Sequence, residues 1–273
     1  MVRRMSVKPT VLKLGGSVIT DKEKPLTPNL QAIERLADEI SRANVSSLLL
    51  VHGGGSFGHP VAERYGISEG YVDSSQILGF SATHLAMTLL NSWVMEALIS
   101  HNIPAVEIHP SSCLVTKAGR INNMELKPLK KMLKMGFAPV LYGDAILDSE
   151  KGFTILSGDQ LVSSLAIKLG AKRIIMGADV DGLYTADPKI DSSAQLIDHV
   201  TLEELKSLEH KIEGSKATDV TGGMLGKMRE VTLAIEHNIE TVIVNATKSG
   251  RVYKALKGEK VIGTIIEKGE TVG

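Results

Sequence analysis

Short apolar runs and amphipathic stretches alternate along the chain. Residues 10–14 and 47–51 are apolar runs that end at or near glycines, as buried parallel strands do. Between them, residues 29–42 place apolar side chains on one helical face. Further runs predict strands at residues 103–108, 138–142, 173–176, 241–244 and 261–265, and helices at residues 125–135, 159–169 and 224–237. This alternation predicts an α/β fold with a mainly parallel sheet and helices on both faces.

Residues 75–101 form the longest helical pattern, and it has two apolar stripes. The stripes consist of Leu85, Leu89, Trp93 and Ala97, and of Met87, Leu90, Val94 and Leu98. A helix that is apolar on two faces is buried on two sides. We therefore expect a core helix, or a helix whose second stripe lies in a subunit interface or an apolar ligand pocket.

Three shorter patterns complete the outline. Residues 145–147 and 153–156 predict a hairpin. Residues 201–204 have the capping-box pattern of a helix start. Residues 209–223 are polar with several glycines, so we expect a mobile loop there. The absence of a long linker, a repeat or a low-complexity stretch favours a single domain over residues 1–273.

Composition narrows the class of protein. The 273 residues are 43% hydrophobic, and their 31 basic and 31 acidic residues give a formal net charge of zero. A balanced charge does not indicate a nucleic-acid partner or an anionic membrane. The single cysteine, Cys113, excludes an internal disulfide and a cysteine-cluster zinc site, and it suits a reducing cytoplasm. No segment approaches the roughly 18 to 20 apolar residues of a membrane span.

Two glycine loops follow predicted strands. Residues 11–14 run into Gly15-Gly16-Ser17, and residues 48–51 run into His52-Gly53-Gly54-Gly55-Ser56-Phe57-Gly58-His59. Glycine lets backbone N–H groups turn toward a ligand with no Cβ in the way, and such a loop can form an anion-binding nest. One loop carries a lysine and the other a histidine. The pair predicts two phosphate groups held near each other, which is the geometry of a phosphotransferase.

Lysines accompany these loops. Lys13 alternates with Leu12 and Leu14, so its side chain points to the face opposite theirs, toward either the surface or a phosphate. Lys22, in the next loop, reads on its own as a surface lysine. Lys227 follows two glycines near a predicted helix start, and a cation at a helix N-terminus makes a good anion site.

Four aspartates each allow two interpretations. Asp159 follows Ser157 and Gly158, and it either caps its helix or orients active-site lysines. Asp179, Asp181 and Asp187 surround a strand end near a glycine and a proline. They serve either turn geometry or contact with a nucleotide and its Mg²⁺.

Several common motifs are missing. The sequence has no G-x-x-x-x-G-K-[ST] and no well-placed G-x-G-x-x-G, which disfavours a P-loop NTPase and a Rossmann dehydrogenase. Protein-kinase motifs are also missing. His52 and His59 lack a third ligand at metal-binding spacing, so we expect no zinc site. His59 ends a glycine loop, where an imidazole serves a ligand more readily than a core.

The ordered motifs resemble those of the amino acid kinase family and, within it, the isopentenyl phosphate kinases. The resemblance covers nearly the whole chain and rests on residues 13–17 with Lys22, 52–59, 157–159, 179–184 with 187–188, and 219–224 with Lys227. The second block discriminates, because in isopentenyl phosphate kinases a histidine at the position of His59 binds the acceptor phosphate. Glutamate, acetylglutamate, aspartate, carbamate and UMP kinases do not keep that loop in this form.

The resemblance implies a three-layer αβα sandwich around a mostly parallel, roughly eight-stranded sheet. Residues up to about 155 would bind the acceptor, and residues from about 156 would bind ATP. It also implies ATP with Mg²⁺, a small-molecule substrate, a homodimer, and phosphorylation of isopentenyl phosphate to isopentenyl diphosphate in isoprenoid biosynthesis.

The same resemblance assigns roles to residues. Lys13, Lys22, His59 and Asp159 would be catalytic. The nucleotide would contact Lys13, Gly15, Gly16, Ser17, Gly55, Asp179, Gly223 and Lys227, and the acceptor would contact Gly54, His59 and Gly158. For the apolar tail of the acceptor, we name Phe80, Thr83, Met87, Ile146 and Ile155 as candidate pocket residues.

Two alternatives stay open. One is a kinase for another small acid or phosphonate such as fosfomycin, the acceptor of the nearest neighbouring kinases. An amino-acid acceptor would need a carboxylate near residues 53–55, and none is evident. The other is a non-catalytic binding or storage protein of the same fold, which loss of Lys13 or Lys22 would have favoured.

Overall fold

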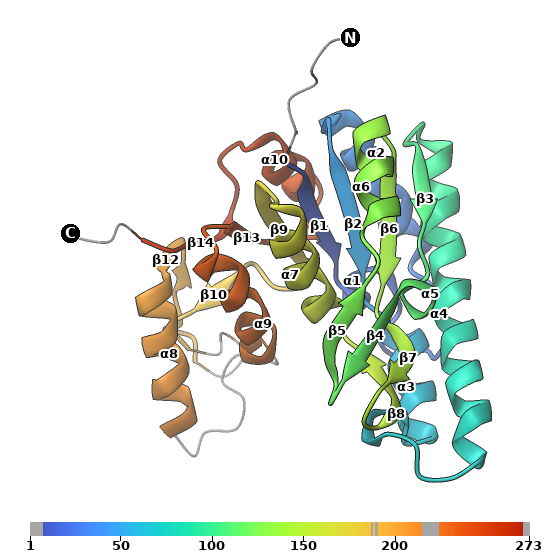
Figure 1. Ribbon diagram of the computed structural model, residues 1–273. Helices are drawn as coiled ribbons and strands as arrows, with labels where there is room; N and C mark the ends of the chain where they lie inside the picture. Colours follow the sequence, from blue (N-terminus) through green and yellow to red (C-terminus); the bar gives the residue numbers. More distant parts are fainter. Residues whose placement is uncertain (1–7, 187, 189–190, 215–223, 270–273) are drawn as a thin grey trace.

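The computed structural model describes residues 8–186, 188, 191–214 and 224–269, with backbone only for residues 209–214 and 224–227. Its described part contains an eight-stranded central sheet, labelled in Figure 1. Its strands are, in spatial order, β12 (His199–Thr201), β14 (Gly263–Glu267), β13 (Glu240–Asn245), β9 (Arg173–Ala178), β1 (Thr10–Leu14), β2 (Leu48–His52), β6 (Ala138–Tyr142) and β3 (Ala105–Glu107). From β13 to β3 every neighbouring pair is parallel, whereas β14 runs antiparallel to β13. The mostly parallel sheet is confirmed.

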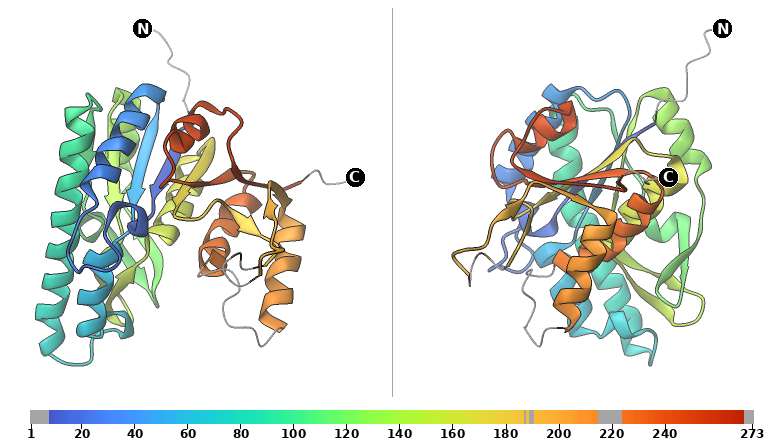
Figure 2. Two further views of the ribbon diagram at one scale, coloured as in Figure 1. Left: turned by 180° about the vertical axis from the view of Figure 1, so that it is seen from behind. Right: turned by 90° about the vertical axis from the view of Figure 1, so that its left-hand side faces the viewer.

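Helices cover both faces of this sheet, as Figure 2 shows. One face packs against α2 (Leu30–Ala43), α4 (Ser75–Ser100) and α10 (Arg251–Lys257), and the other against α6 (Lys127–Met135), α7 (Gly158–Leu169), α8 (Leu202–Gly214) and α9 (Met224–Glu236). Alternate side chains of β1 divide between these two cores: Leu12 and Leu14 join the first, and Val11 joins the second. The predicted three-layer αβα sandwich is therefore confirmed.

Smaller elements were only partly predicted. A four-stranded sheet has the order β5 (Arg120–Met124), β4 (Leu114–Lys117), β7 (Asp144–Asp148) and β8 (Gly152–Leu156). The β7–β8 hairpin confirms the prediction, whereas β4 and β5 were missed because β5 is polar and largely exposed. Strands β10 (Leu183–Tyr184) and β11 (Leu196–Ile197) form a further pair. The short helices α1 (Gly16–Ile19), α3 (Gly55–Arg64), η1 (Ile67–Glu69) and α5 (Pro110–Cys113) were missed as well.

The polar stretch at residues 209–223 needs a correction. Residues 209–214 belong to helix α8, and residues 215–223 lie outside the described part. The start of α8 confirms the capping box: the backbone N–H of Thr201 donates to Glu204 Oε2 at 2.8 Å, and the N–H of Glu204 donates to Thr201 Oγ1 at 3.3 Å. A satisfied cap fixes where the helix begins.

Helix α4 buries one of its two apolar stripes. Met87, Leu90, Val94 and Leu98 lie in the core against α2 and the sheet. On the other stripe Ala97 is buried, but Leu85, Leu89 and Trp93 are 59%, 50% and 41% exposed. Within the described part of the chain, no helix is both long enough and apolar enough to cross a membrane.

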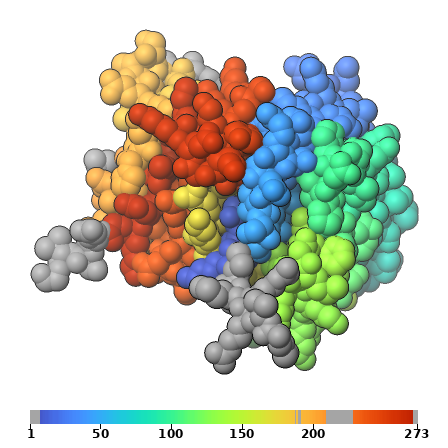
Figure 3. Space-filling view, turned by 90° about the horizontal axis from the view of Figure 1, so that it is seen from above, coloured from blue at the N-terminus to red at the C-terminus, as the bar shows by residue number. Residues whose placement is uncertain are grey.

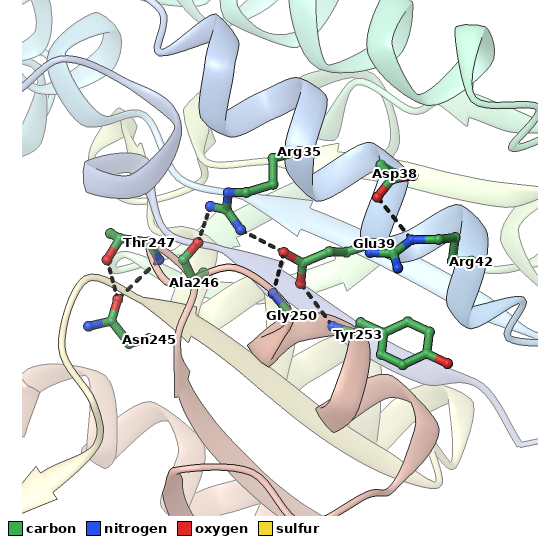
Figure 4. A network of polar contacts seen from close by, with 9 residues as sticks. All are labelled: Arg35, Asp38, Glu39, Arg42, Asn245, Ala246, Thr247, Gly250 and Tyr253. Atoms are coloured by element: carbon green, nitrogen blue, oxygen red, sulfur yellow. Dashed lines mark hydrogen bonds and ion pairs between the residues drawn. The ribbon is translucent and has the colours of Figure 1, made fainter.

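A buried carboxylate ties α2 to α10, as Figure 4 shows. Glu39 has no solvent exposure, and it accepts hydrogen bonds from Arg35 at 2.7 Å, from the N–H of Gly250 at 2.8 Å and from the N–H of Tyr253 at 3.0 Å. It therefore satisfies N–H groups at the start of α10 that no helical carbonyl reaches. In Figure 3 the later part of the chain (yellow to red) lies beside the earlier part (blue to green), with the two in direct contact.

Candidate active site

The two glycine loops meet at the carboxyl ends of neighbouring strands. The N–H of Gly15 donates to Gly177 O at 2.8 Å, and the N–H of Gly53 donates to Leu14 O at 3.0 Å. A Cβ on Gly16 would lie 2.2 Å from the backbone nitrogen of Gly55, so no other residue fits there. The predicted juxtaposition of the loops is confirmed, and it depends on backbone packing against backbone.

A residue that the sequence did not single out joins the loops. The hydroxyl of Thr20 donates to Gly16 O at 2.8 Å and accepts from the N–H of Ser56 at 3.1 Å. Thr20 is buried, so both contacts form away from bulk water. Its only sequence signal was its place just after the first loop.

A cavity of about 780 Å³ opens at these loops. Ten residues with predicted roles line it: Lys13, Gly15, Gly16, Ser17, Lys22, Gly54, Gly55, His59, Gly158 and Asp159. Gly223 lies outside the described residues, and for Lys227 only the backbone, within α9, is described. Residues far apart in the sequence thus face one space.

Lys13 and Asp159 form an ion pair on one wall of the cavity. Lys13 shares its face of β1 with Val11, as its alternation with Leu12 and Leu14 predicted, and that face packs on α7. The reading of Asp159 as a helix cap is wrong, because Ser157 caps α7 by accepting from the N–H of Gln160 at 3.1 Å. Asp159 instead pairs with the lysine.

Lys22 and Asp179 form a second ion pair. Burial alone would raise the pKa of Asp179, but hydrogen bonding and charge from Lys22 outweigh this and hold it below its ordinary value. Lys22 lines the cavity, and its side chain is 58% exposed. Both cations are therefore held by carboxylates at the edge of the space.

Asp181, further along the chain, is held by side chains of later elements. Asp181 accepts hydrogen bonds from Asn245 at 2.8 Å and from Arg251 at 2.6 Å. These contacts join the loop after β9 to the end of β13 and the start of α10. Asp187 lies outside the described residues.

His59 lies on helix α3, one turn after the glycine loop. Its side chain is exposed and lines the cavity. The helix starts at Gly55, whose nitrogen lies against Gly16 of the first loop, whereas the N–H groups of Ser56 and Phe57 donate to Thr20 and to Gly54 O. The amino end of a helix favours anions, and an exposed imidazole beside it can donate a further hydrogen bond.

The apolar part of the lining only partly matches the prediction. Thr83, Met87 and Ile155 line the cavity, and Phe80 packs on Phe153 close to it. Ile146 was a wrong choice: it is fully buried in the core on the α7 face of the sheet. The side chains of Asp144, Ala145 and Ile146 alternate between the two faces of β7, and the sequence does not show which face lines the cavity.

A buried acid near the cavity was not predicted. Burial raises the pKa of Asp144 to about 6, although the neighbouring His84 opposes the shift. His84 Nδ1 lies 2.8 Å from Asp144 Oδ2. No motif drew attention to this pair because it joins α4 to β7, which lie 60 residues apart.

Comparison with known proteins identifies relatives across the whole fold. Residues 8–245 match the model of the amino acid kinase family. The isopentenyl phosphate kinase of Methanothermobacter thermautotrophicus is 43% identical over 265 residues, which are 94% of this chain and 98% of that protein. The enzyme of the same name from Methanocaldococcus jannaschii is 36% identical, with 94% and 98% covered.

Solved structures agree with these relatives. One described as X-ray structures of isopentenyl phosphate kinase superposes with a TM-score of 0.82 at 39% identity, covering 94% of this chain and all of that one. A product complex of the Thermoplasma acidophilum isopentenyl phosphate kinase gives 0.76 at 28% identity, covering 94% and 99%.

Proposed function

Because this chain belongs to the amino acid kinase family, we propose that it transfers a phosphoryl group from ATP to isopentenyl phosphate. The products are ADP and isopentenyl diphosphate, and the step serves isoprenoid biosynthesis. The observation that carries this choice of acceptor is the place of His59 on the cavity wall, beside the glycine loops. The full-length similarity to isopentenyl phosphate kinases supports it.

The acceptor needs little chemical activation. A phosphate monoester has a second pKa of about 6, so it is mostly dianionic near pH 7 and attacks without a general base. The enzyme must bring two anions together in line and neutralise their charge. His59 and the N–H groups of Gly54 and Gly158 hold the acceptor phosphate. Thr83, Met87 and Ile155 are placed to contact its apolar tail.

The donor side uses the two lysines. Lys13, oriented by Asp159, bridges the transferring phosphoryl group, and Lys22 stabilises the charge that develops on it. Asp179, released from Lys22 when the lysine turns to phosphate, faces the nucleotide. The nucleotide is further held by Gly15, Gly16, Ser17, Gly55, Gly223 and Lys227.

We propose that Mg²⁺ would bind with ATP, at its phosphates. Among the residues that the structure describes, no three acidic, histidine or cysteine side chains cluster to hold a metal ion, so phosphate oxygens would supply most of its ligands. When bound, Mg²⁺ neutralises phosphate charge.

We also propose a homodimer and a cytoplasmic location. The exposed stripe of Leu85, Leu89 and Trp93 on α4 is apolar, and a second copy of α4 would cover it. A C2 contact of this kind buries the same patch on both subunits. The cytoplasmic location follows from the single free cysteine and stays a prediction.

A panel of acceptors tests the function. Purified protein is incubated with Mg-ATP and isopentenyl phosphate, fosfomycin, glutamate, carbamate or UMP, and ADP is measured. We expect isopentenyl phosphate to give by far the highest kcat/KM. Equal or greater ADP formation with fosfomycin would favour the phosphonate kinase, and no transfer to any acceptor would favour a binding protein.

A further inference from the structure

A chain of buried polar side chains lies behind the second glycine loop. It runs from Glu107 on β3 through Asn91 on α4 to His52, the last residue of β2. His52 is 1% exposed and Asn91 is fully buried, whereas the Glu107 side chain is 44% exposed. None of the three lines the cavity, so the proposed reaction leaves them without a role.

The contacts along this chain are specific. Asn91 donates its Nδ2–H to Glu107 Oε2 at 2.7 Å, which leaves Asn91 Oδ1 facing His52 Nε2 at 3.2 Å. His52 Nδ1 lies 3.1 Å from the carbonyl oxygen of Gly53. One face of the imidazole stacks on Tyr142, with ring centroids 5.2 Å apart. The imidazole therefore has a polar neighbour at each nitrogen and an aromatic ring on one face.

The orientation of the amide follows from charge. An ionised Glu107 only accepts hydrogen bonds, so Asn91 must turn its Nδ2–H toward it. Both atoms that face the imidazole are then acceptors, so a neutral ring, which carries a single N–H, donates to one of them at a time. Burial lowers the pKa of His52 and opposes double protonation. The Asn91 oxygen, which Glu107 orients, lies beside Nε2 and partly offsets the lowering of this pKa.

The last contact reaches the active site. Gly53 precedes Gly54, whose N–H holds the acceptor phosphate in the proposed function, and the N–H of Gly53 itself donates to Leu14 O. The adjacent Gly54 lies against Met87, another residue of α4. Helix α4 thus supports this loop at two points: Met87 packs against it, and Asn91 acts through His52.

We propose that Glu107 and Asn91 are positioning residues that hold His52 and, through it, the Gly53–Gly54 backbone in the orientation that binds the acceptor phosphate. This rests on the proposed function. A change at the Asn91–His52 contact should alter the affinity for the acceptor more than the affinity for ATP, because the lysines proposed to engage ATP lie on other elements. A purely structural role would change stability without favouring either substrate.

The first test replaces Asn91 with leucine, which is of similar size and makes no hydrogen bond. We expect KM for isopentenyl phosphate to rise about 2- to 12-fold, the equivalent of one hydrogen bond, while KM for ATP stays within about twofold. Val94→Ala is the matched control, since it opens the same helix's core one turn away without touching His52. It should lower Tm and leave both KM values unchanged.

Exchanging the amide and the carboxylate at positions 91 and 107 tests which side chain donates the hydrogen bond between them. Asn91→Asp places a carboxylate against Glu107 and should raise KM for isopentenyl phosphate further. Adding Glu107→Gln supplies a donor to the introduced carboxylate, which still presents an acceptor to His52, so the double variant should recover most of the loss. Failure of the double variant to improve on Asn91→Asp would overturn the proposal.

A substrate-independent measurement separates this inference from the proposed function. In ¹⁵N-glycine-labelled protein, Asn91→Leu should shift the amide signals of Gly53, Gly54 and Gly55 and leave those of Gly170 and Gly258 unchanged. If Asn91→Leu does not fold, Glu107→Leu at the exposed end should shift the same signals. Unchanged loop signals with a lowered Tm would overturn the positioning role, whatever acceptor the wild type uses.

Discussion

Lys13 and Asp159 form an ion pair although 146 positions separate them in the sequence. The pair joins the two parts of the chain that are proposed to serve acceptor and nucleotide, and its side chains are only 7% and 16% exposed. The lysine is thus held by a carboxylate of the protein itself. Its orientation is therefore a property of the folded protein rather than of the ligand.

Asp159→Ala should damage both stability and turnover. Removing one partner of a buried ion pair costs about 3 kcal/mol, the lower end of the usual range, because the cavity admits water. A displaced Lys13 should lower kcat about 10²-fold. Urea unfolding and steady-state kinetics on the same preparation measure the two effects. Asp159→Asn keeps an acceptor and should lie between wild type and Asp159→Ala; a normal kcat for Asp159→Ala would contradict the orienting role.

Lys22→Ala should lower kcat more than it raises KM for ATP. The lysine is proposed to meet charge that develops only during transfer, and the loss of one such donor costs about 10²- to 10³-fold. Lys24→Ala is the control: Lys24 is 73% exposed at its side chain and does not line the cavity. If Lys22→Ala changes only KM, the lysine binds ground-state ATP instead.

Asp144 should give the protein a pH-dependent stability. Burial raises its pKa to about 6, above its ordinary 3.8. The folded state binds this proton more tightly than the unfolded state, so the stabilisation is present below pH about 4 and is lost as pH rises through 6. The loss is about 3 kcal/mol. The free energy of unfolding of wild type minus that of Asp144→Asn should therefore fall between pH of about 4 and pH of about 7.

Asp148 provides a control of opposite sign. Burial would raise its pKa, but the N–H groups of Gly119, Lys151 and Glu150 hold it well below the ordinary value. Its stabilisation is present above the unfolded pKa and is lost only as pH falls through the lower, folded-state pKa. Wild type minus Asp148→Asn should thus rise with pH in the acid range. Parallel pH dependence in the two comparisons would contradict the assignment for Asp144.

Leu89→Arg should convert a dimer to a monomer. Leu89 is 50% exposed in the middle of the apolar stripe of α4, and two arginines would meet across a twofold contact. Sedimentation equilibrium measures the mass. Ile262→Arg is the control, because Ile262 is a similarly exposed apolar residue (58%) on another surface, and that variant should keep the wild-type mass. A wild-type protein that sediments as a monomer would contradict the proposed interface.

The framework was predictable because buried strands leave a strong periodic signal. The alternation around Lys13 correctly indicated its face, and the glycine loops correctly indicated the end of the sheet where they meet. Helix α3 was missed because its glycines and Pro60 have low helix propensity, and tertiary contacts set where it begins. The β4–β5 hairpin was missed because β5 carries polar side chains on an exposed edge.

Partners across the fold could not be predicted. Nothing local links Lys22 to Asp179, Thr20 to Ser56, or His52 to Asn91, since each pair depends on how the chain returns to the same edge. Asp159 and Ser157 both suit a helix cap, and only the geometry of α7 assigns that role to Ser157. The residue types of the site could therefore be read from the sequence, whereas their pairing depends on the fold.

His59→Ala separates the proposed function most sharply from its rivals. A charge-assisted hydrogen bond is worth about 1.5–3 kcal/mol, so kcat/KM for isopentenyl phosphate should fall about 10- to 150-fold. His59→Gln keeps a neutral donor and should recover part of the loss. Because the side chain is exposed on α3, Tm should stay within about a degree of wild type.

A structural role for His59 predicts the opposite pair of results. Tm would then fall, and the enzyme that stays folded would show normal acceptor kinetics. Thermal unfolding and acceptor kinetics on one sample of His59→Ala decide between them, with KM for ATP as the internal reference, since His59 is not among the residues proposed to hold the nucleotide. A destabilised variant with unchanged kcat/KM would remove His59 from the site, and with it the main reason to prefer a phosphate monoester over a phosphonate or carboxylate acceptor.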